Sequence, residues 1–215
     1  MDKNTEKLKK SLDWLFDQTY LAKRSFDAIL AVSKVYSETS VLGLYGDYFG
    51  YTQNVMIGEV QLSLAKIFVE NKDSHSIVQV IEQANQTFTE EYFKEVDYDE
   101  KESYEELKKK LMDIEKESKK LSCTITKLRR IRNKNLAHLD KKISTFEELE
   151  SFLNKNMISV RDVHKLIDFA IESILCIKRI VFNVQVNVIE KYDYESEISK
   201  IAKAMEFYSD HQNNE

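Results

Sequence analysis

One short segment combines side chains that can bind an anion with a side chain that can move a proton. It reads Arg-Asn-Lys-Asn-Leu-Ala-His-Leu-Asp and covers residues 132–140. The guanidinium of Arg132 can hold a phosphate through two parallel hydrogen bonds, and the imidazole of His138, with an ordinary pKa of about 6.5, can give or take a proton near neutral pH. On one straight helix these residues stand about 9 Å apart along the axis and about 120° apart around it. They can converge on one group where two copies of the chain meet across a two-fold axis.

The segment lies in a basic region of an acidic chain. Residues 116–142 carry ten lysines and arginines against Glu117 and Asp140, a net charge of +8, whereas the whole chain carries −5. This concentration of positive charge fits a polyanionic partner. The alternative is a solvent-exposed basic helix face that pairs with the acidic residues of 89–106.

A row of apolar residues leads into the segment and predicts the helix that positions it. The row has alternating spacings of four and three, typical of a buried helix face, and we expect one helix over about 100–138. Continued at the same spacing, the row reaches Arg132, Asn135 and then Leu139; with a shift of one residue it passes through Ile131 to His138. Either register places polar groups where apolar ones are expected, and buried charge is costly unless it is paired or functional. The row consists of Leu107, Leu111, Ile114, Ser118, Leu121, Ile125 and Leu128.

These residues resemble a known family. Arg132-Asn133 followed by His138 resembles the R-x(4–6)-H motif of HEPN domains, and the string over 132–140 is similar to their AbiU2-like branch, which is associated with abortive infection against phage. The resemblance covers roughly residues 10–185. It implies an all-α fold and metal-independent cleavage of RNA at a homodimer interface, in phage defence or as the toxin of a toxin–antitoxin pair.

The resemblance also assigns roles to the residues of the segment. Arg132 stabilises the charge on the phosphate, His138 acts as acid or base, and Asn133 holds His138 or the phosphate. Asp140, with Asn135 in support, orients the imidazole or caps the helix. RNA, a second copy and an antitoxin protein are the expected partners, with no cofactor, metal or membrane. The RNA phosphates on either side of the cleaved one are expected to contact Lys127, Arg129, Arg130 and Lys134.

Two other functions fit the same residues. A HEPN-like module without catalysis would use the segment to bind a nucleotide, RNA or a protein, and would be weakened by Arg132→Ala and by salt. A plain helical scaffold would use its basic helix to meet its own acidic segment. Turnover of RNA distinguishes the leading interpretation from the first alternative, and RNA binding at low salt distinguishes it from the second.

Composition supports an all-α fold. The 215 residues include no proline and only four glycines, so a turn-rich sandwich or barrel is excluded. We expect a single domain over 1–215, an elongated up-and-down helical bundle in the cytoplasm, without a signal peptide or a spanning helix. Cys123 and Cys176 are predicted to be reduced core thiols.

The remaining elements follow from apolar periodicity and capping residues. The apolar helix over about 48–69 is expected near the centre of the bundle. Tyr45, Tyr48, Phe49 and Tyr51 are expected to pack in the core, with stacking on bases as the alternative. Phe182–Val188 alternates as a strand does, but helix is preferred because an isolated strand has no partner. The other predicted helices cover about 5–36, 74–88 with a cap at Asp73 or Ser74, 144–153, a long one after a cap at Ser159, and 194–208 before a frayed tail over 209–215.

Overall fold

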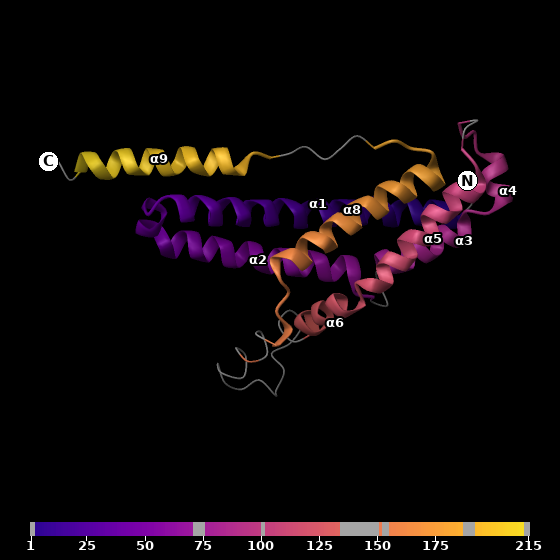
Figure 1. Ribbon diagram of the computed structural model, residues 1–215, viewed down its shortest axis with the longest axis horizontal. Coiled ribbons are helices and arrows are strands. Elements are labelled where there is room, and N and C mark those ends of the chain that lie inside the picture. Colours follow the sequence, from indigo (N-terminus) through magenta and orange to yellow (C-terminus); the bar gives the residue numbers. More distant parts are fainter. Residues whose placement is uncertain are drawn as a thin grey trace. The chain divides into compact units, whose positions relative to one another are not determined.

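The computed structural model describes residues 3–70, 76–99, 102–133, 151, 155–186 and 192–212. The fold is all-α, as predicted, and the described residues contain no strand (Figure 1). The chain divides into two compact units, one of residues 1–20 and 61–188, the other of residues 21–60 and 189–215. The elements are α1 (Lys3–Glu38), the 3₁₀ helix η1 (Val41–Tyr45), α2 (Gly46–Phe68), α3 (Ile77–Thr87), α4 (Glu90–Glu95), α5 (Tyr104–Lys120), α6 (Ser122–Ile131), α8 (Val160–Phe182) and α9 (Tyr194–Gln212).

The core of the first unit is built on α3, α5 and α8, which pack against one another. Their apolar residues recur at spacings of three and four, so each helix buries one face. On α8 this face is continuous over about four turns, and eight of its residues are buried. These are Leu166, Ile167, Ala170, Ser173, Ile174, Ile177, Ile180 and Val181.

Two of these helices have N-cap serines, whose side chains accept hydrogen bonds from backbone N–H groups of the first turn. Ser76 forms a capping box with Gln79, in which each side chain accepts a hydrogen bond from the other residue's backbone N–H. The predicted caps at Asp73 and Ser74 lie outside the described residues, and the helix starts later than expected. Ser159 caps α8 as predicted, since its Oγ accepts from the N–H of Asp162 at 3.1 Å.

The helix predicted over about 100–138 is interrupted within the described residues. α5 ends at Lys120, and the N–H of Leu121 bonds to the carbonyl of Ser118 at 3.1 Å instead of continuing the regular ladder. The hydroxyl of Ser118 also donates to the carbonyl of Glu115 at 2.7 Å, a local bond that bends helices. α6 then starts at Ser122, so the residues before and after Leu121 do not share one straight helix.

α8 ends at Phe182, so the prediction of helix through Val188 is wrong for residues 183–186. Asn183 adopts the left-handed conformation that commonly closes a helix, with φ 51°, and its Nδ2 donates to the carbonyl of Asp97 at 2.7 Å. Two tyrosine hydroxyls satisfy carbonyls of the last turn: Tyr92 donates to Val181 at 2.7 Å and Tyr98 donates to Ile180. The α4 segment and the loop after it therefore close the end of α8.

The Tyr98 contact predicts that stability falls at alkaline pH. Burial, with a smaller contribution from Tyr92, raises the pKa of Tyr98 to about 12. An unfolded tyrosine ionises near pH 10. The folded chain keeps the proton between these values and the unfolded chain loses it, so the contribution of Tyr98 is complete below about pH 10 and is lost as pH rises toward about 12.

Urea unfolding of wild type and Tyr98→Phe at neutral and alkaline pH measures this contribution. At neutral pH the variant is expected to lose about 1 kcal/mol, because the Ile180 carbonyl loses its donor. The difference between the two proteins is expected to shrink as pH rises above 10. Tyr208→Phe, which changes an exposed hydroxyl, serves as the control. A difference that stays constant with pH contradicts the assignment.

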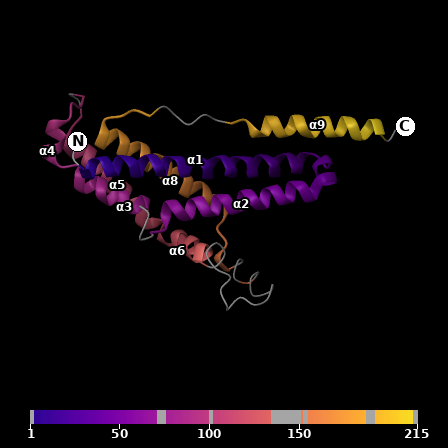
Figure 2. The ribbon, with the colours of Figure 1, turned by 180° about the vertical axis from the view of Figure 1, so that it is seen from behind.

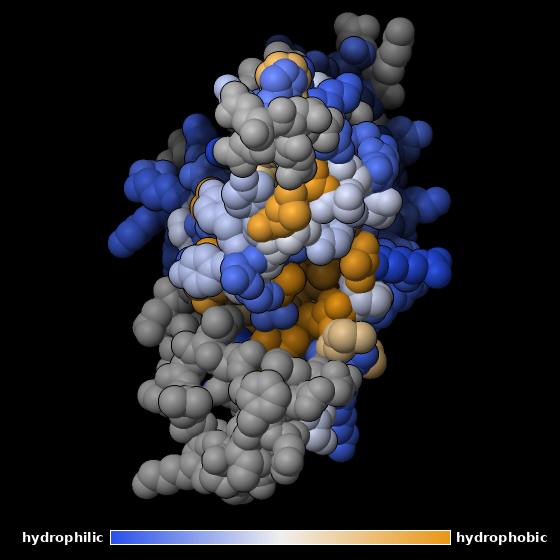
Figure 3. All heavy atoms as spheres, turned by 90° about the vertical axis from the view of Figure 1, so that its left-hand side faces the viewer, coloured by the Kyte–Doolittle hydropathy of each residue, from blue (hydrophilic) through white to orange (hydrophobic). Residues whose placement is uncertain are grey.

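The second unit contains the end of α1, η1, the start of α2, and α9. α1 and α2 run antiparallel in both ribbon views (Figures 1 and 2), and Gln53 Nε2 donates to Ser33 Oγ at 3.1 Å between them. α9 continues to Gln212, so residues 209–212 of the predicted frayed tail are helical. Hydrophobic residues, shown in orange, reach the surface on the side that faces the viewer in Figure 3. The small core of this unit consists of Val35, Val41, Leu42 and Ala202, with Phe49, Ile198 and Met205 packed against it.

Candidate functional site

The described part of the candidate site, Arg132 and Asn133, directly follows α6. Ile125, Leu128 and Ile131 are buried, which fixes the register that the sequence left open. The apolar row continues through Ile131, and Arg132 lies outside it with an intermediate exposure. The guanidinium is therefore not buried in the core of its own chain.

Arg132 is held by its neighbour. Its Nε and Nη2 both donate to Oδ1 of Asn133, at 3.2 and 3.1 Å. Within the described residues no carboxylate contacts this guanidinium, so the ion pair that would make it purely structural is not found there. One edge of the guanidinium is fixed by the amide, and the opposite Nη1 remains a donor for an anion.

The other residues predicted for the centre of the site lie outside the described residues. These are His138, Asn135 and Asp140, together with Lys134. The predicted short helix over about 144–153 also lies almost wholly outside them. The structure thus places Arg132 and Asn133, and the arrangement of His138 around them stays a prediction.

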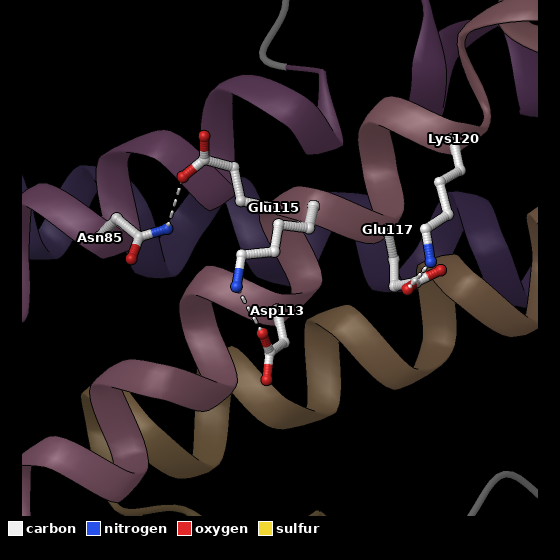
Figure 4. A network of polar contacts seen from close by, with 6 residues as sticks. Asn85, Asp113, Glu115, Glu117 and Lys120 are labelled. Carbon is white, nitrogen blue, oxygen red and sulfur yellow. Dashed lines mark hydrogen bonds and ion pairs between the residues drawn. The ribbon is translucent and has the colours of Figure 1, made fainter.

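The basic side chains divide into two groups along the chain. On α5, Lys116 pairs with Asp113 at 3.0 Å, Lys119 with Glu115 at 2.8 Å, and Lys120 with Glu117. Figure 4 shows Asp113, Glu115 and Glu117 on the same helix as Lys120, and Glu115 also accepts a hydrogen bond from Asn85. The hydrogen bond to Glu115, followed by its charge, raises the pKa of Lys119. Much of the positive charge before Leu121 is therefore balanced locally.

On α6 the basic residues are less engaged. Arg129 and Arg130 are exposed in its last turn, where positive charge is favoured by the negative end of the helix dipole. Lys127 is half-buried, and its ammonium donates to the carbonyl of Met157 at 3.3 Å. Positive charge available to an external anion is therefore concentrated around the end of α6, next to Arg132.

The acidic segment that could have neutralised this surface has other described contacts. Glu102 pairs with Arg179 of α8 at 2.9 Å, and Glu90 pairs with Lys94 at 2.7 Å. These ion pairs stabilise the segment whose Tyr92 and Tyr98 hydroxyls bond to the last turn of α8. They give the segment over 89–106 a structural role that does not require the basic helix.

Sequence reasoning assigned one group of residues wrongly. Tyr45, Tyr48 and Tyr51 were expected in the core, but they are exposed by 53, 67 and 70%. Phe49 alone packs against the core of its unit. The repeat of aromatic residues every three to four positions signalled an apolar helix face, but not whether that face belongs to the core or to an outer surface.

The described residues do not hold any group of three or more histidine, cysteine, aspartate or glutamate side chains suited to a metal ion. In the same residues, no helix combines the length and apolarity needed to cross a bilayer. Cys123, predicted in the core, is exposed, whereas Cys176 is half-buried and burial raises the pKa of its thiol.

Comparison with known proteins agrees with the sequence motif. The HEPN family model described as AbiU2 matches residues 5–198, which include the whole of α2, α6 and α8. Searches of curated proteins and of solved structures found no match.

Proposed function

Because the chain belongs to the AbiU2 family of HEPN domains, we propose that it is a metal-independent endoribonuclease that acts in phage defence or in a toxin–antitoxin system. Family membership associates the chain with abortive infection. The proposal adds the chemistry: RNA is cleaved by attack of its own 2′-hydroxyl, at a site shared by two protomers.

The observation that supports this proposal most directly is the state of Arg132. The guanidinium is half-exposed, oriented by Asn133 and next to the basic end of α6. An arginine that is fixed before its anion arrives loses little entropy on binding. Such a group suits the stabilisation of charge on a phosphate.

The proposed reaction needs only proton transfer and charge stabilisation. A base removes the proton of the 2′-hydroxyl, the O2′ atom bonds to phosphorus, and the bond to O5′ breaks as an acid protonates that oxygen. His138 supplies one of these proton transfers, since its imidazole can act in either direction near neutral pH. Arg132 stabilises the extra negative charge that the phosphate oxygens gain in the transition state.

The basic side chains of α6 position the RNA. Arg129, Arg130 and Lys127 can contact phosphates on either side of the scissile bond without reading sequence. Lys134 is proposed to extend this surface. Because such contacts release counterions, binding is expected to weaken steeply with salt.

Digestion of RNA by the purified protein in the presence of EDTA tests the proposed reaction. We expect fragments that end in a 2′,3′-cyclic phosphate and a 5′-hydroxyl, because the attacking oxygen belongs to the substrate. RNA whose 2′-hydroxyls are methylated is the matched control and is expected to stay intact. Cleavage of the methylated RNA, or 5′-phosphate ends, contradicts the mechanism.

A non-catalytic HEPN-like module is the second candidate, and the Arg132–Asn133 contact also supports it. The amide already occupies the Nε edge that a phosphate would use for two parallel hydrogen bonds. An arginine engaged in this way can retain a nucleotide or RNA without turnover. Binding of RNA that Arg132→Ala weakens, with no cleavage under any of the conditions above, identifies this function.

A further inference from the structure

The start of α2, with η1 before it, presents an apolar face to solvent. We call the face formed by Leu44, Tyr48, Tyr51 and Val55 the tyrosine face, and its side chains are exposed by 67, 67, 70 and 53%. The last three lie on one side of α2, at spacings of three and four residues, and Leu44 precedes them on η1. Contiguous apolar patches of a few hundred Å² on a protein surface usually mark an interaction site.

The opposite side of the same helix packs inside its own unit. Phe49 lies against the small core, Val60 is buried, and Gln53 donates to Ser33 Oγ at 3.1 Å. This stretch of α2 is therefore apolar on two sides, of which its own unit covers one. A helix that is hydrophobic all round is normally covered all round.

The stretch that forms the tyrosine face carries only negative charge. Residues 35–65 include Glu38, Asp47 and Glu59 but no lysine or arginine. Asp47 is exposed and lies one turn before Tyr51, about 40° away from it around the helix axis. A second copy of the face would double this negative charge, whereas a basic partner is attracted to it.

A pocket at the turn before the tyrosine face is suited to a basic side chain. Its volume is about 490 Å³, and it contains a carboxylate, three aliphatic hydroxyl groups and a tyrosine. The oxygen atoms can accept hydrogen bonds from an ammonium or a guanidinium, and an aromatic ring attracts either cation. A second carboxylate is close by, because Thr39 in the wall donates a hydrogen bond to Glu206 of α9. The pocket is lined by Tyr36, Ser37, Glu38, Thr39, Ser40 and Gly43.

The size of the tyrosine face fits one short helix. Its four side chains supply on the order of 500 Å², whereas stable protein–protein interfaces bury about 800 Å² per partner. The row from Leu44 to Val55 covers about 17 Å, the length of three helical turns. An occupant that packs along this row therefore needs only a single amphipathic helix.

We propose that the tyrosine face binds an amphipathic helix of another protein, whose apolar row packs on the face and whose lysines or arginines lie beside Asp47 and in the pocket at Glu38. Tyrosines often contribute most of the binding energy in such contacts. Nucleic acid is disfavoured, because proteins that stack bases on aromatic residues combine them with a positively charged groove. The face belongs to the unit that does not contain Arg132, so the inference goes beyond the proposed ribonuclease and does not rest on it.

Three synthetic helical peptides of about 14 residues test the charge of the partner on the full chain. They share one apolar row and carry lysine, glutamine or glutamate at the positions beside it. Fluorescence anisotropy of the labelled peptides measures binding. The lysine peptide is expected to bind at least about tenfold more tightly than the glutamine peptide, because several ion pairs form, and the glutamate peptide is expected to bind most weakly. Raising the salt from about 0.1 to about 1 M is expected to remove most of this preference.

Two substitutions assign the binding to the tyrosine face. Tyr51→Arg places a positive charge in the middle of the face and is expected to weaken binding of the lysine peptide at least about tenfold. Asp47→Lys is expected to weaken the lysine peptide and to strengthen the glutamate peptide. Tyr208→Arg, at a tyrosine with the same 70% exposure on α9 and with the same change in charge as Tyr51→Arg, is the matched control and is expected to bind like wild type.

Hydrogen exchange locates the contact on the chain, whatever the oligomeric state. Amides of residues 44–58 are expected to gain protection when the lysine peptide is added, while those of α6 stay unchanged and Arg132→Ala behaves like wild type. The proposal is overturned if Tyr51→Arg binds the lysine peptide as tightly as wild type does, or if the glutamine or glutamate peptide binds as tightly as the lysine peptide. It is also overturned if amides 44–58 gain protection with protein concentration alone, which assigns the face to a second copy.

Discussion

Arg132→Ala is expected to lower the rate of RNA cleavage by about 10²–10³-fold, because the phosphate loses a positioned donor in the transition state. Arg132→Lys is expected to recover little of this loss, since an ammonium can neither donate from two rigidly spaced nitrogens to Asn133 nor present a planar pair of donors. Initial rates with a labelled RNA, at saturating and at limiting substrate, separate the loss of turnover from the loss of binding.

His138→Ala is expected to abolish cleavage to a similar extent, because proton transfer to or from the RNA then falls to water. The rate of the wild type is expected to change with pH around the ordinary imidazole pKa of about 6.5. Asn133→Ala is expected to fall between wild type and Arg132→Ala, since the guanidinium stays but is no longer held.

Lys109→Ala is the control for both substitutions. Lys109 is exposed in the first half of α5, so its removal changes the net charge as Arg132→Ala does, on a helix that ends before α6 begins. Urea unfolding of each variant confirms that the fold is intact. Full cleavage by the two alanine variants rules out the ribonuclease proposed for this site.

Helix positions were predictable from the sequence wherever the physical signals agreed. The periodic apolar residues of α8, preceded by Ser159, combine burial of one face with a side-chain cap, and the structure follows both. The cap of α3 was missed because Ser76 follows two other residues, Asp73 and Ser74, that can cap equally well. Only the reciprocal bond with Gln79 distinguishes them.

The register at the candidate site could not be predicted because it depends on a local bond. A single hydroxyl contact, from Ser118 to the carbonyl of Glu115, accompanies the break at Leu121. After the break Ile131, not Arg132, faces the core. The motif itself was visible in the sequence, but which of its groups is buried was not.

Tyr48 and Tyr51 show a different limit. Periodicity reports that a helix face is apolar, and burial within the same chain is the usual reason. An exposed apolar face has the same pattern, so these two residues were expected in the core although they are exposed by 67 and 70%. The absence of lysine and arginine from 35 to 65 was the signal available beforehand, since it already disfavoured contact with nucleic acid there.

Phe88→Ala is expected to reduce the free energy of unfolding by about 3–5 kcal/mol, the usual cost of removing a buried phenyl ring. Phe88 is fully buried. Its ring lies 6.4 Å from that of Tyr92, 6.2 Å from those of Phe93 and Tyr98, and 5.5 Å from that of Tyr104. Removing it leaves a cavity among rings that cannot collapse freely, because the hydroxyls of Tyr92 and Tyr98 are bonded to the last turn of α8.

The backbone carbonyl of Phe88 also forms a hydrogen bond, which the substitution of its side chain does not remove. This carbonyl accepts from the ammonium of Lys108 at 3.0 Å, and burial lowers the pKa of that lysine. Urea unfolding followed by circular dichroism measures the total loss, and Phe207→Ala, whose ring on α9 is 59% exposed, is expected to lose less than about 1 kcal/mol. Since native domains are stable by about 5–15 kcal/mol, Phe88→Ala is expected to stay mostly folded at low temperature. A loss as small as that of Phe207→Ala would show that the aromatic cluster does not hold α4 and the end of α8 together.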